Sequence, residues 1–344
     1  MKTDDFDYEL PSGMIAQHPV TPRDACRLMV VDRATGGIEH RTFGDLPEYL
    51  RRGDVLVLNQ TRVLPARLRG AKDDTGGVVE VLLLRRLYGE TWECLVRPGR
   101  RLKPGARVTF GDGEVAGLVV DVVEESGARV VQFSKREGLF LDAVHRLGEV
   151  PLPPYIAEPL RDPEEYQTVY ATDEHSVAAP TAGLHFTREM LDAVQRQGVH
   201  LATVELDVGL DTFRPVSEAD PLDHTIHTEH YRVPRPAVDA INDARARGSR
   251  IVAVGTTSVR AIESAYNEVT RAVEPAEGMT DLFILPGFTF GVTDALITNF
   301  HVPRSTLLMM VSAFAGRELV MHAYETARAE GYRFLSFGDA MLIV

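Results

Sequence analysis

The stretch RIVAVGTTSVRAIES (250–264) places an apolar run of strand length directly before a helical pattern, with Gly255 between them. Residues 250–254 predict a buried strand, and a helix is expected to begin at the pair Thr256 and Thr257. The same alternation continues on both sides. Further strands are expected at 54–59, 201–208, 281–285, 295–300 and 332–337. Further helices are expected at 187–197, 237–247 and 305–330, the last one broken near Gly316. This alternation is typical of an α/β domain in which helices cover a sheet.

Residues 69–150 have a different texture. Short runs rich in Val, Leu and aromatic residues alternate with turn clusters such as DDTGG (73–77) and GDG (111–113), which favours a small β-barrel. A helical pattern at 139–147 closes the segment, and four prolines in GEVPLPPYIAEP (148–159) then exclude regular structure. We therefore predict an α/β main domain with a mixed sheet, formed by residues 1–68 and 151–344. The barrel, residues 69–150, is predicted to be an insertion within it.

The charge distribution separates the two predicted domains. The 344-residue chain has a formal net charge of −13, which argues against a sequence-blind nucleic-acid binder. The barrel segment, however, has thirteen basic and thirteen acidic residues, and residues 85–107 hold seven basic residues against two acidic ones. A solvated loop is the plain interpretation. The more specific interpretation is a patch that contacts nucleic-acid phosphates, in which Trp92 could stack on a base. The candidate phosphate contacts are Arg97, Arg100, Arg101 and Lys103.

Composition also bounds the cellular setting. A 44% hydrophobic content is enough for a sizeable core. The two cysteines, Cys26 and Cys94, form neither a disulfide framework nor a zinc motif, which fits a reducing compartment. The N-terminus lacks the apolar segment of a signal peptide, and no apolar run approaches the roughly 20 residues that span a bilayer. We expect a cytoplasmic monomer without membrane association.

Two motifs combine small residues with groups that bind ligands. In AAPTAGLHFT (178–187), small residues would let the backbone approach a ligand, and the candidates are Pro180, Thr181, Ala182, Gly183 and His185. The alternative is a tight turn before a helix capped by Thr187. In VGTTSVRAIES (254–264), the start of the helix would attract an anion, and Arg260 could add a bidentate contact. Ordinary capping by Thr256 or Thr257 is the alternative.

Two further motifs contain histidine. In LITNFHVPRSTLL (296–308), Asn299 and His301 follow a buried strand, where open α/β sheets bind ligands, although an ordinary loop histidine is commoner. HTIHTEHY (224–231) contains His224 and His227 at helical spacing with Glu229 nearby, but that spacing is nonspecific and we predict no metal site. GxSxG, GxGxxG, HExxH and the P-loop motif are absent.

Taken together, the motifs resemble the S-adenosylmethionine:tRNA ribosyltransferase-isomerase family of queuosine biosynthesis. The resemblance runs nearly end to end, through these segments: DFDYELP (5–11), LNQTRVLPARL (58–68), GEVPLPPYI (148–156), VAAPTAGLHFT (177–187), AVGTTSVRAIES (253–264), LITNFHVPRSTLLMMVSAFAG (296–316) and YRFLSFGDAMLI (332–343). The family's fold is an α/β domain that carries a smaller β-barrel domain, in agreement with the division above.

The resemblance implies a specific reaction. S-adenosylmethionine donates its ribosyl unit to 7-aminomethyl-7-deazaguanine at the tRNA wobble position, and epoxyqueuosine forms while adenine and methionine leave. S-adenosylmethionine is consumed, so no cofactor is implied. His185 and His301 are the candidates for proton transfer, with acid and base left open. Arg260 with the Thr256 and Thr257 amides is the candidate anchor for a carboxylate or ribose. The candidates for binding substrate hydroxyls or base edges are Asn299, Asp294, Glu229 and Asp339.

The chain departs from the family pattern in a few places. The usual HVGxGTF strand reads DVGLDTF (207–213) here, so Asp207 and Asp211 replace a His and a Gly. His175 stands in place of a common Gly, and Ile226 in place of a Met. These departures leave one alternative open, a paralogous S-adenosylmethionine-dependent ribosyltransferase with a different, small-molecule acceptor. A non-catalytic tRNA-binding protein is a further, separate hypothesis. We prefer the interpretation that these departures are variation between lineages and that the chain has the family's own activity.

Overall fold

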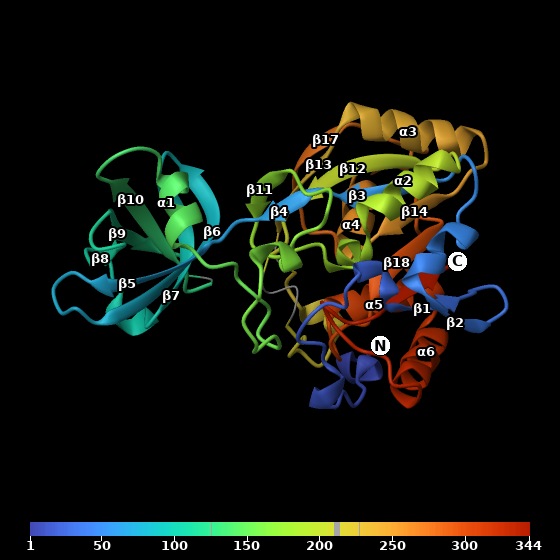
Figure 1. Cartoon of the computed structure of the whole chain (residues 1–344), viewed down its shortest axis with the longest axis horizontal. Coiled ribbons are helices and arrows are strands. Elements are labelled where there is room, and N and C mark those ends of the chain that lie inside the picture. The colour runs from blue at the N-terminus through green and yellow to red at the C-terminus, as the bar shows by residue number, and fades with distance from the viewer. Residues whose placement is uncertain (125, 210–213, 227) are drawn as a thin grey trace. The chain divides into compact units, whose positions relative to one another are not determined.

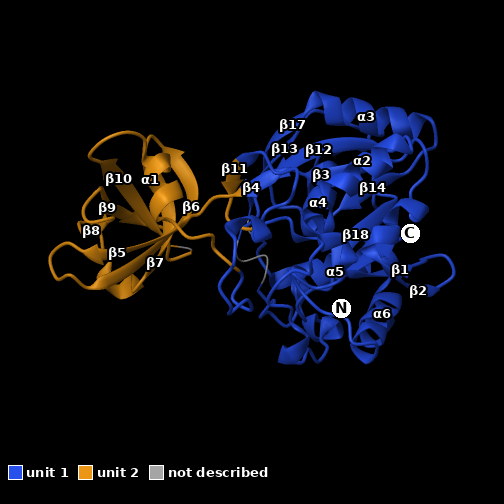
Figure 2. Cartoon of the chain, viewed as in Figure 1, with its two compact units in different colours: residues 1–62, 153–173, 179–344 blue, residues 63–152, 174–178 orange. Residues whose placement is uncertain are grey.

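A computed structural model describes residues 1–124, 126–209, 214–226 and 228–344 (Figure 1). The chain divides into two compact units (Figure 2). Residues 1–62, 153–173 and 179–344 form the main unit, and residues 63–152 and 174–178 form the barrel unit.

A nine-stranded mixed sheet is the centre of the main unit, in the order β17-β13-β12-β3-β14-β18-β19-β1-β2. Its strands in chain order are β1 (Arg27–Val31), β2 (Ile38–Thr42), β3 (Val55–Asn59), β12 (His200–Leu206), β13 (Glu229–Val233), β14 (Ile251–Val254), β17 (Ala276–Thr280), β18 (Ala295–Asn299) and β19 (Ala340–Ile343). The four neighbours β12, β3, β14 and β18 are parallel. Every residue of β3, β14, β18 and β19 is buried, as expected for strands covered on both faces.

Helices cover this sheet, and their boundaries follow local signals. They are α2 (Arg188–Arg196), α3 (Arg235–Ala246), α4 (Thr256–Ser264), α5 (Thr306–Ala315) and α6 (Arg317–Ala329). Thr187 caps α2 by accepting a hydrogen bond from the Met190 N–H at 3.2 Å, as predicted. Gly316, at φ +87°, separates α5 from α6, because a residue in that conformation cannot continue a helix.

Short elements complete the main unit and the chain segments that border it. The 3₁₀ turns are η1 (Thr3–Phe6), η2 (Ser12–Met14), η3 (Arg23–Ala25), η4 (Phe43–Tyr49), η6 (Pro163–Tyr166), η7 (Thr181–His185) and η9 (Pro221–Asp223). The short strands are β4 (Thr61–Val63), β11 (Asp173–Ser176), β15 (Tyr266–Asn267) and β16 (Ala272–Val273).

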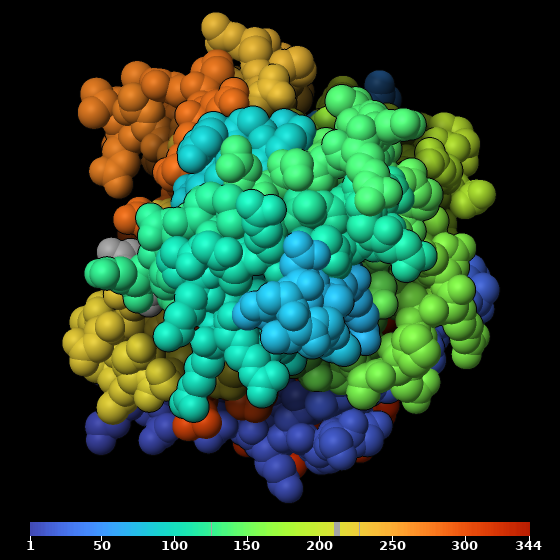
Figure 3. Space-filling view, turned by 90° about the vertical axis from the view of Figure 1, so that its left-hand side faces the viewer, coloured from blue at the N-terminus to red at the C-terminus, as the bar shows by residue number. Residues whose placement is uncertain are grey.

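The barrel unit is a closed antiparallel barrel in the order β10-β7-β6-β5-β8-β9, and Figure 3 shows its surface in cyan and green. Its elements are β5 (Arg67–Lys72), β6 (Val78–Tyr88), β7 (Thr91–Arg97), η5 (Gly99–Arg101), β8 (Arg107–Phe110), β9 (Val115–Val122), β10 (Arg129–Lys135) and α1 (Phe140–Leu147). Gly70 is required on β5, because a Cβ there would lie 2.2 Å from the Thr109 carbonyl oxygen. The two ends of the unit meet: the Arg67 and Glu149 backbones exchange hydrogen bonds of 3.1 and 2.9 Å.

The predicted fold class, a helix-covered mixed sheet with a small β-barrel, is confirmed. Two predicted strands are wrong. Residues 281–285 follow β17 as a loop, and residues 332–337 form a loop in which Leu335 has φ +69°. In that second loop the apolar side chains serve as core, since Tyr332 and Phe334 pack on the Phe300 ring, and the pairing strand is β19 instead. No helix within the described residues is long and apolar enough to span a membrane.

Candidate functional site

Three of the four motifs converge on one small cavity of about 20 Å³ in the main unit, here called the small cavity. Strands β14 and β18 are parallel neighbours, with Val254 opposite Ile297, so their carboxyl ends meet at one edge of the sheet. Turn η7 and the start of α4 reach the same edge. Most of the lining comes from the predicted motifs: Pro180, Thr181, Ala182, Thr256, Thr257, Asn299 and His301.

Asn299 is held in one orientation at this cavity. Its Nδ2 donates to the Leu335 carbonyl at 3.2 Å, and its Oδ1 accepts from the Thr181 hydroxyl at 3.1 Å. Nδ2 also lies 3.0 Å from His185 Nε2. Because a carbonyl oxygen can only accept, Asn299 is the donor to both partners, and His185 Nε2 is the acceptor.

His185 therefore carries its proton on Nδ1, which lies 3.3 Å from Cys26 Sγ. The ring is buried beside Phe43 and lies outside the lining of the small cavity. Burial, with Arg333 and Arg23 nearby, holds the pKa of His185 at about 3, so the imidazole is neutral at ordinary pH. His185 thus contacts Asn299 but lies behind the residues that line the small cavity.

Cys26, His185 and Asn299 have the residue types of a cysteine-hydrolase triad, but their environment does not fit that chemistry. Cys26 is only 2% exposed, and burial raises the pKa of its thiol above the ordinary value. A reactive cysteine requires an accessible thiolate. We interpret this set as a hydrogen-bonded core that orients Asn299.

His301 lies in the wall of the small cavity. Its Nε2 is 2.7 Å from the Thr298 hydroxyl, while its backbone N–H donates to the Tyr324 hydroxyl at 2.9 Å. The Tyr8 hydroxyl donates to the His301 carbonyl at 2.5 Å. Burial lowers the pKa of His301 to about 3. The cavity wall thus contains a neutral imidazole whose backbone is fixed from both sides.

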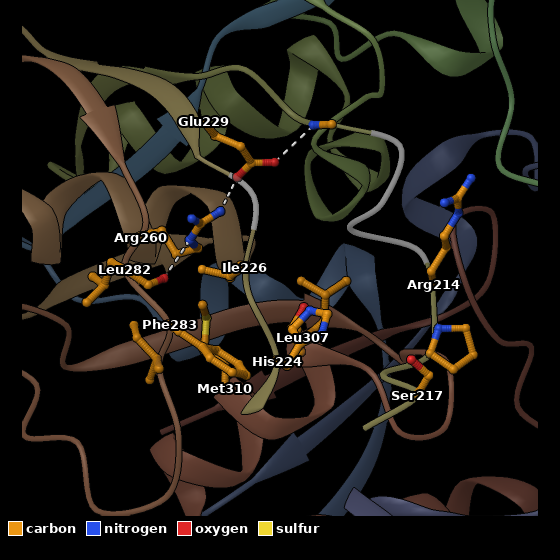
Figure 4. Close-up of a pocket in the computed structure, with 14 residues that line it drawn as sticks. Arg214, Ser217, His224, Ile226, Glu229, Arg260, Leu282, Phe283, Leu307 and Met310 are labelled. Atoms are coloured by element: carbon orange, nitrogen blue, oxygen red, sulfur yellow. Dashed lines mark hydrogen bonds and ion pairs between the residues drawn. The ribbon is translucent and has the colours of Figure 1, made fainter. Parts of the chain in front are cut away.

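Arg260 and Glu229 form a buried ion pair on a second cavity of about 230 Å³, here called the large cavity (Figure 4). Arg260 Nε also donates to the Leu282 carbonyl at 3.0 Å, and Glu229 accepts from the Gly209 N–H at 2.9 Å. The apolar wall of the large cavity consists of Ile226, Leu282, Phe283, Ile284, Leu307 and Met310. Arg260 therefore does not join Thr256 and Thr257 as one anchor, because its charge is paired and it lines a different cavity. Leu307 lines both cavities.

Three other candidates lie away from the cavity lining. A Cβ on Gly183 would lie 2.0 Å from the Tyr170 hydroxyl, so this glycine is required by packing. Asp339 is buried, and its two oxygens accept from the backbone N–H groups of Arg27 (3.0 Å) and Arg333 (2.7 Å). Asp294 precedes β18 and accepts from the Ile251 N–H at 2.8 Å. It therefore lies at the opposite edge of the sheet from Asn299.

The segment in which the chain departs from the family pattern runs along both cavities. Val208 lines the small cavity and Gly209 the large one. Asp207 lies directly after β12, and its carboxylate is 3.7 Å from His230 Nδ1. Asp211 and His227 lie outside the described residues. Among those described, no three His, Cys, Asp or Glu side chains cluster as metal ligands.

The four predicted phosphate contacts are all exposed on the barrel unit. Arg97 ends β7, Arg100 and Arg101 lie in η5, and Lys103 precedes β8. In the described parts of the chain none of these four side chains has a hydrogen bond or ion pair. Arg85 and Arg86, in contrast, pair with Glu93 at 3.0 Å and Glu90 at 3.2 Å. The interpretation of Trp92 as a stacking surface is wrong, because its ring is 8% exposed and packs against Phe140.

Some residues at the cavities were missed by sequence reasoning. Thr298 and Leu307 lie inside a recognised motif, so their contribution could have been predicted. Phe283 and Met310 line the large cavity from a segment interpreted as a strand and from a core helix. Tyr8 belongs to the recognised DFDYELP motif, but its bond to the His301 carbonyl spans 293 positions, and no local pattern indicates it.

The two buried neutral histidines make stability depend on pH. An unfolded histidine binds its proton near pH 6.5, whereas His185 and His301 in the folded protein bind theirs only near pH 3. The unfolded state therefore binds more protons between these values, and stability should fall as pH falls through this window. Each histidine should contribute about 1.4 kcal/mol per pH unit. Urea unfolding from pH 7 to 4 measures the slope. His301→Gln should reduce it by about that amount, and an unchanged slope would contradict the buried neutral state.

Known proteins resemble this chain over its whole length. The family model described as queuosine biosynthesis protein matches residues 3–343. A Symbiobacterium thermophilum protein named S-adenosylmethionine:tRNA ribosyltransferase-isomerase is 57% identical over 344 residues, which is 100% of both chains. A Desulfitobacterium hafniense protein of the same name is 54% identical, also over 100% of both chains. The crystal structure of a Thermotoga maritima S-adenosylmethionine tRNA ribosyltransferase is similar with a TM-score of 0.56 at 41% identity. That match covers 99% of this chain and 100% of the other.

Proposed function

The chain belongs to the queuosine biosynthesis protein family, and from this membership we propose that it moves a ribosyl unit from S-adenosylmethionine to tRNA. It is an enzyme of the transferase-isomerase type. The proposed acceptor is 7-aminomethyl-7-deazaguanine at the wobble position, and the proposed products are epoxyqueuosine-tRNA, adenine and methionine. The observation that carries the proposal is the 57% identity to a protein with this named activity over the full length of both chains.

In this proposal His301 removes a proton from the ribose. The sulfonium charge of S-adenosylmethionine makes the adjacent C5′ protons more acidic, so a neutral base placed beside them can start the reaction. His301 is buried and uncharged at neutral pH, and Thr298 fixes one of its nitrogens. Asn299, oriented by His185 and Leu335, reads a hydroxyl or a base edge. His185 acts on the reaction through Asn299 and is a positioning residue.

The large cavity is the proposed adenine site. Its apolar wall, which includes Phe283, Leu307 and Met310, suits a flat heterocycle. The buried Glu229–Arg260 pair supplies polar groups to the lining without a net charge. The large cavity shares Leu307 with the small cavity, whose wall contains His301, so the ribose would lie where the two cavities adjoin.

One assay tests the proposed function against its alternatives. The protein is incubated with S-adenosylmethionine and with tRNA that carries the aminomethyl-deazaguanine, and adenine release and tRNA mass are measured. We expect adenine release together with a heavier tRNA. Adenine release without a change in the tRNA would favour a small-molecule acceptor, as the carboxylate of Asp207 suggests. Retained tRNA binding without adenine release would favour a non-catalytic protein.

The unpaired cations of the barrel should contribute to tRNA affinity. Changing Arg100, Arg101 and Lys103 together to alanine should weaken tRNA binding and make it less sensitive to salt. The log–log salt slope should become shallower by roughly 0.7–0.9 for each phosphate that the variant no longer neutralises. Binding measured between 50 and 200 mM salt gives the slope. The control is the double variant Arg85→Ala/Arg86→Ala, whose side chains are already paired with Glu93 and Glu90. An unchanged slope in the triple variant would rule out this contact surface.

A further inference from the structure

The start of α4 brings a positive pole to the small cavity. Gly255 precedes the nine-residue helix at φ +85° and offers no side chain to cap it. The N–H groups of the first helical turn have no partner within a helix, and the helix dipole adds partial positive charge at this end. Thr256 and Thr257, the first two residues of α4, both line the cavity. This pole alone would not define a site.

Thr257 supplies a second, independent observation. Thr257 is 8% exposed, and its buried hydroxyl oxygen has no hydrogen-bond partner among the residues that the structure describes. The hydroxyl lies on the side of Thr257 that faces two other lining residues: a Cβ built on Gly255 would lie 3.5 Å from Thr257 Oγ1 and 3.5 Å from the Ala182 methyl group, and all three residues line the cavity. A buried hydroxyl without a partner is costly, so its persistence points to a partner supplied by a ligand.

The charges around the small cavity determine which ligand group fits. Among the described residues that line it there is no acidic side chain and no Lys or Arg, and His301 is neutral. Arg260 is engaged by Glu229 on the large cavity. The positive pole of α4 is therefore unopposed, while the small volume favours a compact head group over a nucleobase. Both properties favour an oxyanion.

We propose that the start of α4 and the Thr257 hydroxyl bind the carboxylate of the methionine end of S-adenosylmethionine. This assignment rests on the proposed function, in which that substrate has one carboxylate and its ribose lies beside His301. A phosphodiester of the tRNA has similar oxyanion chemistry, so the test distinguishes these two sources.

The test compares Thr257→Val with Thr257→Ser in equilibrium binding to the full-length protein. Valine keeps the shape and removes the donor, whereas serine keeps the donor. The probes are S-adenosylmethionine, 5′-methylthioadenosine, which lacks the amino-acid end, and tRNA. We expect Thr257→Val to lose on the order of tenfold to a hundredfold affinity for S-adenosylmethionine. Its affinity for 5′-methylthioadenosine and tRNA should stay near that of the wild type, and Thr257→Ser should bind all three as the wild type does.

The contrary outcomes are distinct. Equal losses for S-adenosylmethionine and 5′-methylthioadenosine, or no loss for either, would overturn the carboxylate site. A loss confined to tRNA would assign the site to a phosphate and overturn the proposal as well. Both outcomes leave the proposed function standing if the wild type binds S-adenosylmethionine. A wild-type protein that binds neither small molecule would instead contradict the proposed function itself.

Discussion

Replacing His301 with alanine should lower the single-turnover rate of adenine release by about 10²–10⁴-fold, the range by which a positioned base accelerates a proton transfer. The backbone of residue 301 would keep its bonds to Tyr8 and Tyr324, so the loop should hold its shape. Rapid quenching with the enzyme in excess over the tRNA, and with saturating S-adenosylmethionine, limits the reaction to one turnover and isolates the chemical step. His322→Ala, on the exposed side of α6, is the matched control and should react at the wild-type rate.

The pH profile sharpens this prediction. Because burial holds the pKa of His301 at about 3, the wild-type rate should show no inflection near pH 6.5, where an ordinary histidine titrates. His185→Ala should differ from His301→Ala, since His185 acts by orienting Asn299 and should mainly raise KM. Near-normal single-turnover rates for His301→Ala would end the assignment of this base. A histidine-like inflection that disappears in His185→Ala would transfer the proton chemistry to His185.

Removing one partner of the Arg260–Glu229 pair should give the largest effect on stability. Both side chains are about 7% exposed, so Arg260→Ala leaves a buried carboxylate without its cation. Loss of one partner from such a pair costs about 3–5 kcal/mol of unfolding free energy. Urea unfolding of the full-length chain, followed by a probe in the main unit, measures the loss.

A double-mutant cycle provides the control for this prediction. Arg260→Met combined with Glu229→Gln removes both charges together, and should be less destabilising than the sum of the two single changes. Strict additivity of the two losses would mean that the charges do not depend on each other, contrary to the geometry in Figure 4.

The elements that were predicted correctly are those whose signals are local. The barrel strands are separated by glycine-rich turns, and α4 begins at the Thr pair because Gly255 ends the apolar strand before it. Strand β13 was missed, since the histidines just before it suggested helical spacing. Residues 332–337 and Ala340–Ile343 are both apolar runs, and only the packing of Phe334 on Phe300 decides which of them pairs in the sheet.

The same division holds for the site. That the start of α4 and the end of β18 meet follows from their parallel strands, β14 and β18, which end at one edge of the sheet. The position of η7 does not follow from this rule, because the strand before it, β11, pairs with β4 in a separate two-stranded sheet. The pairing of Arg260 with Glu229 could not be predicted, because it requires α4 to pack against the missed strand β13. The sequence alone could have excluded Asp294 from the site that contains Asn299. It precedes a strand of five residues, so it must lie at the other end from Asn299, roughly 17 Å away at about 3.3 Å per residue.

The joined ends of the barrel, at Arg67 and Glu149, affect how the main unit can assemble. Strand β3 pairs with β12, and Val55 lies opposite His200, so a long stretch of chain must be closed before this pairing forms. Once the barrel is folded, its joined ends remove the residues between 67 and 149 from that loop and more than halve its effective length. The logarithmic dependence of closure entropy makes this worth roughly 0.7 kcal/mol. An insertion with joined ends therefore leaves the surrounding domain nearly as easy to close as if the insertion were a short connector.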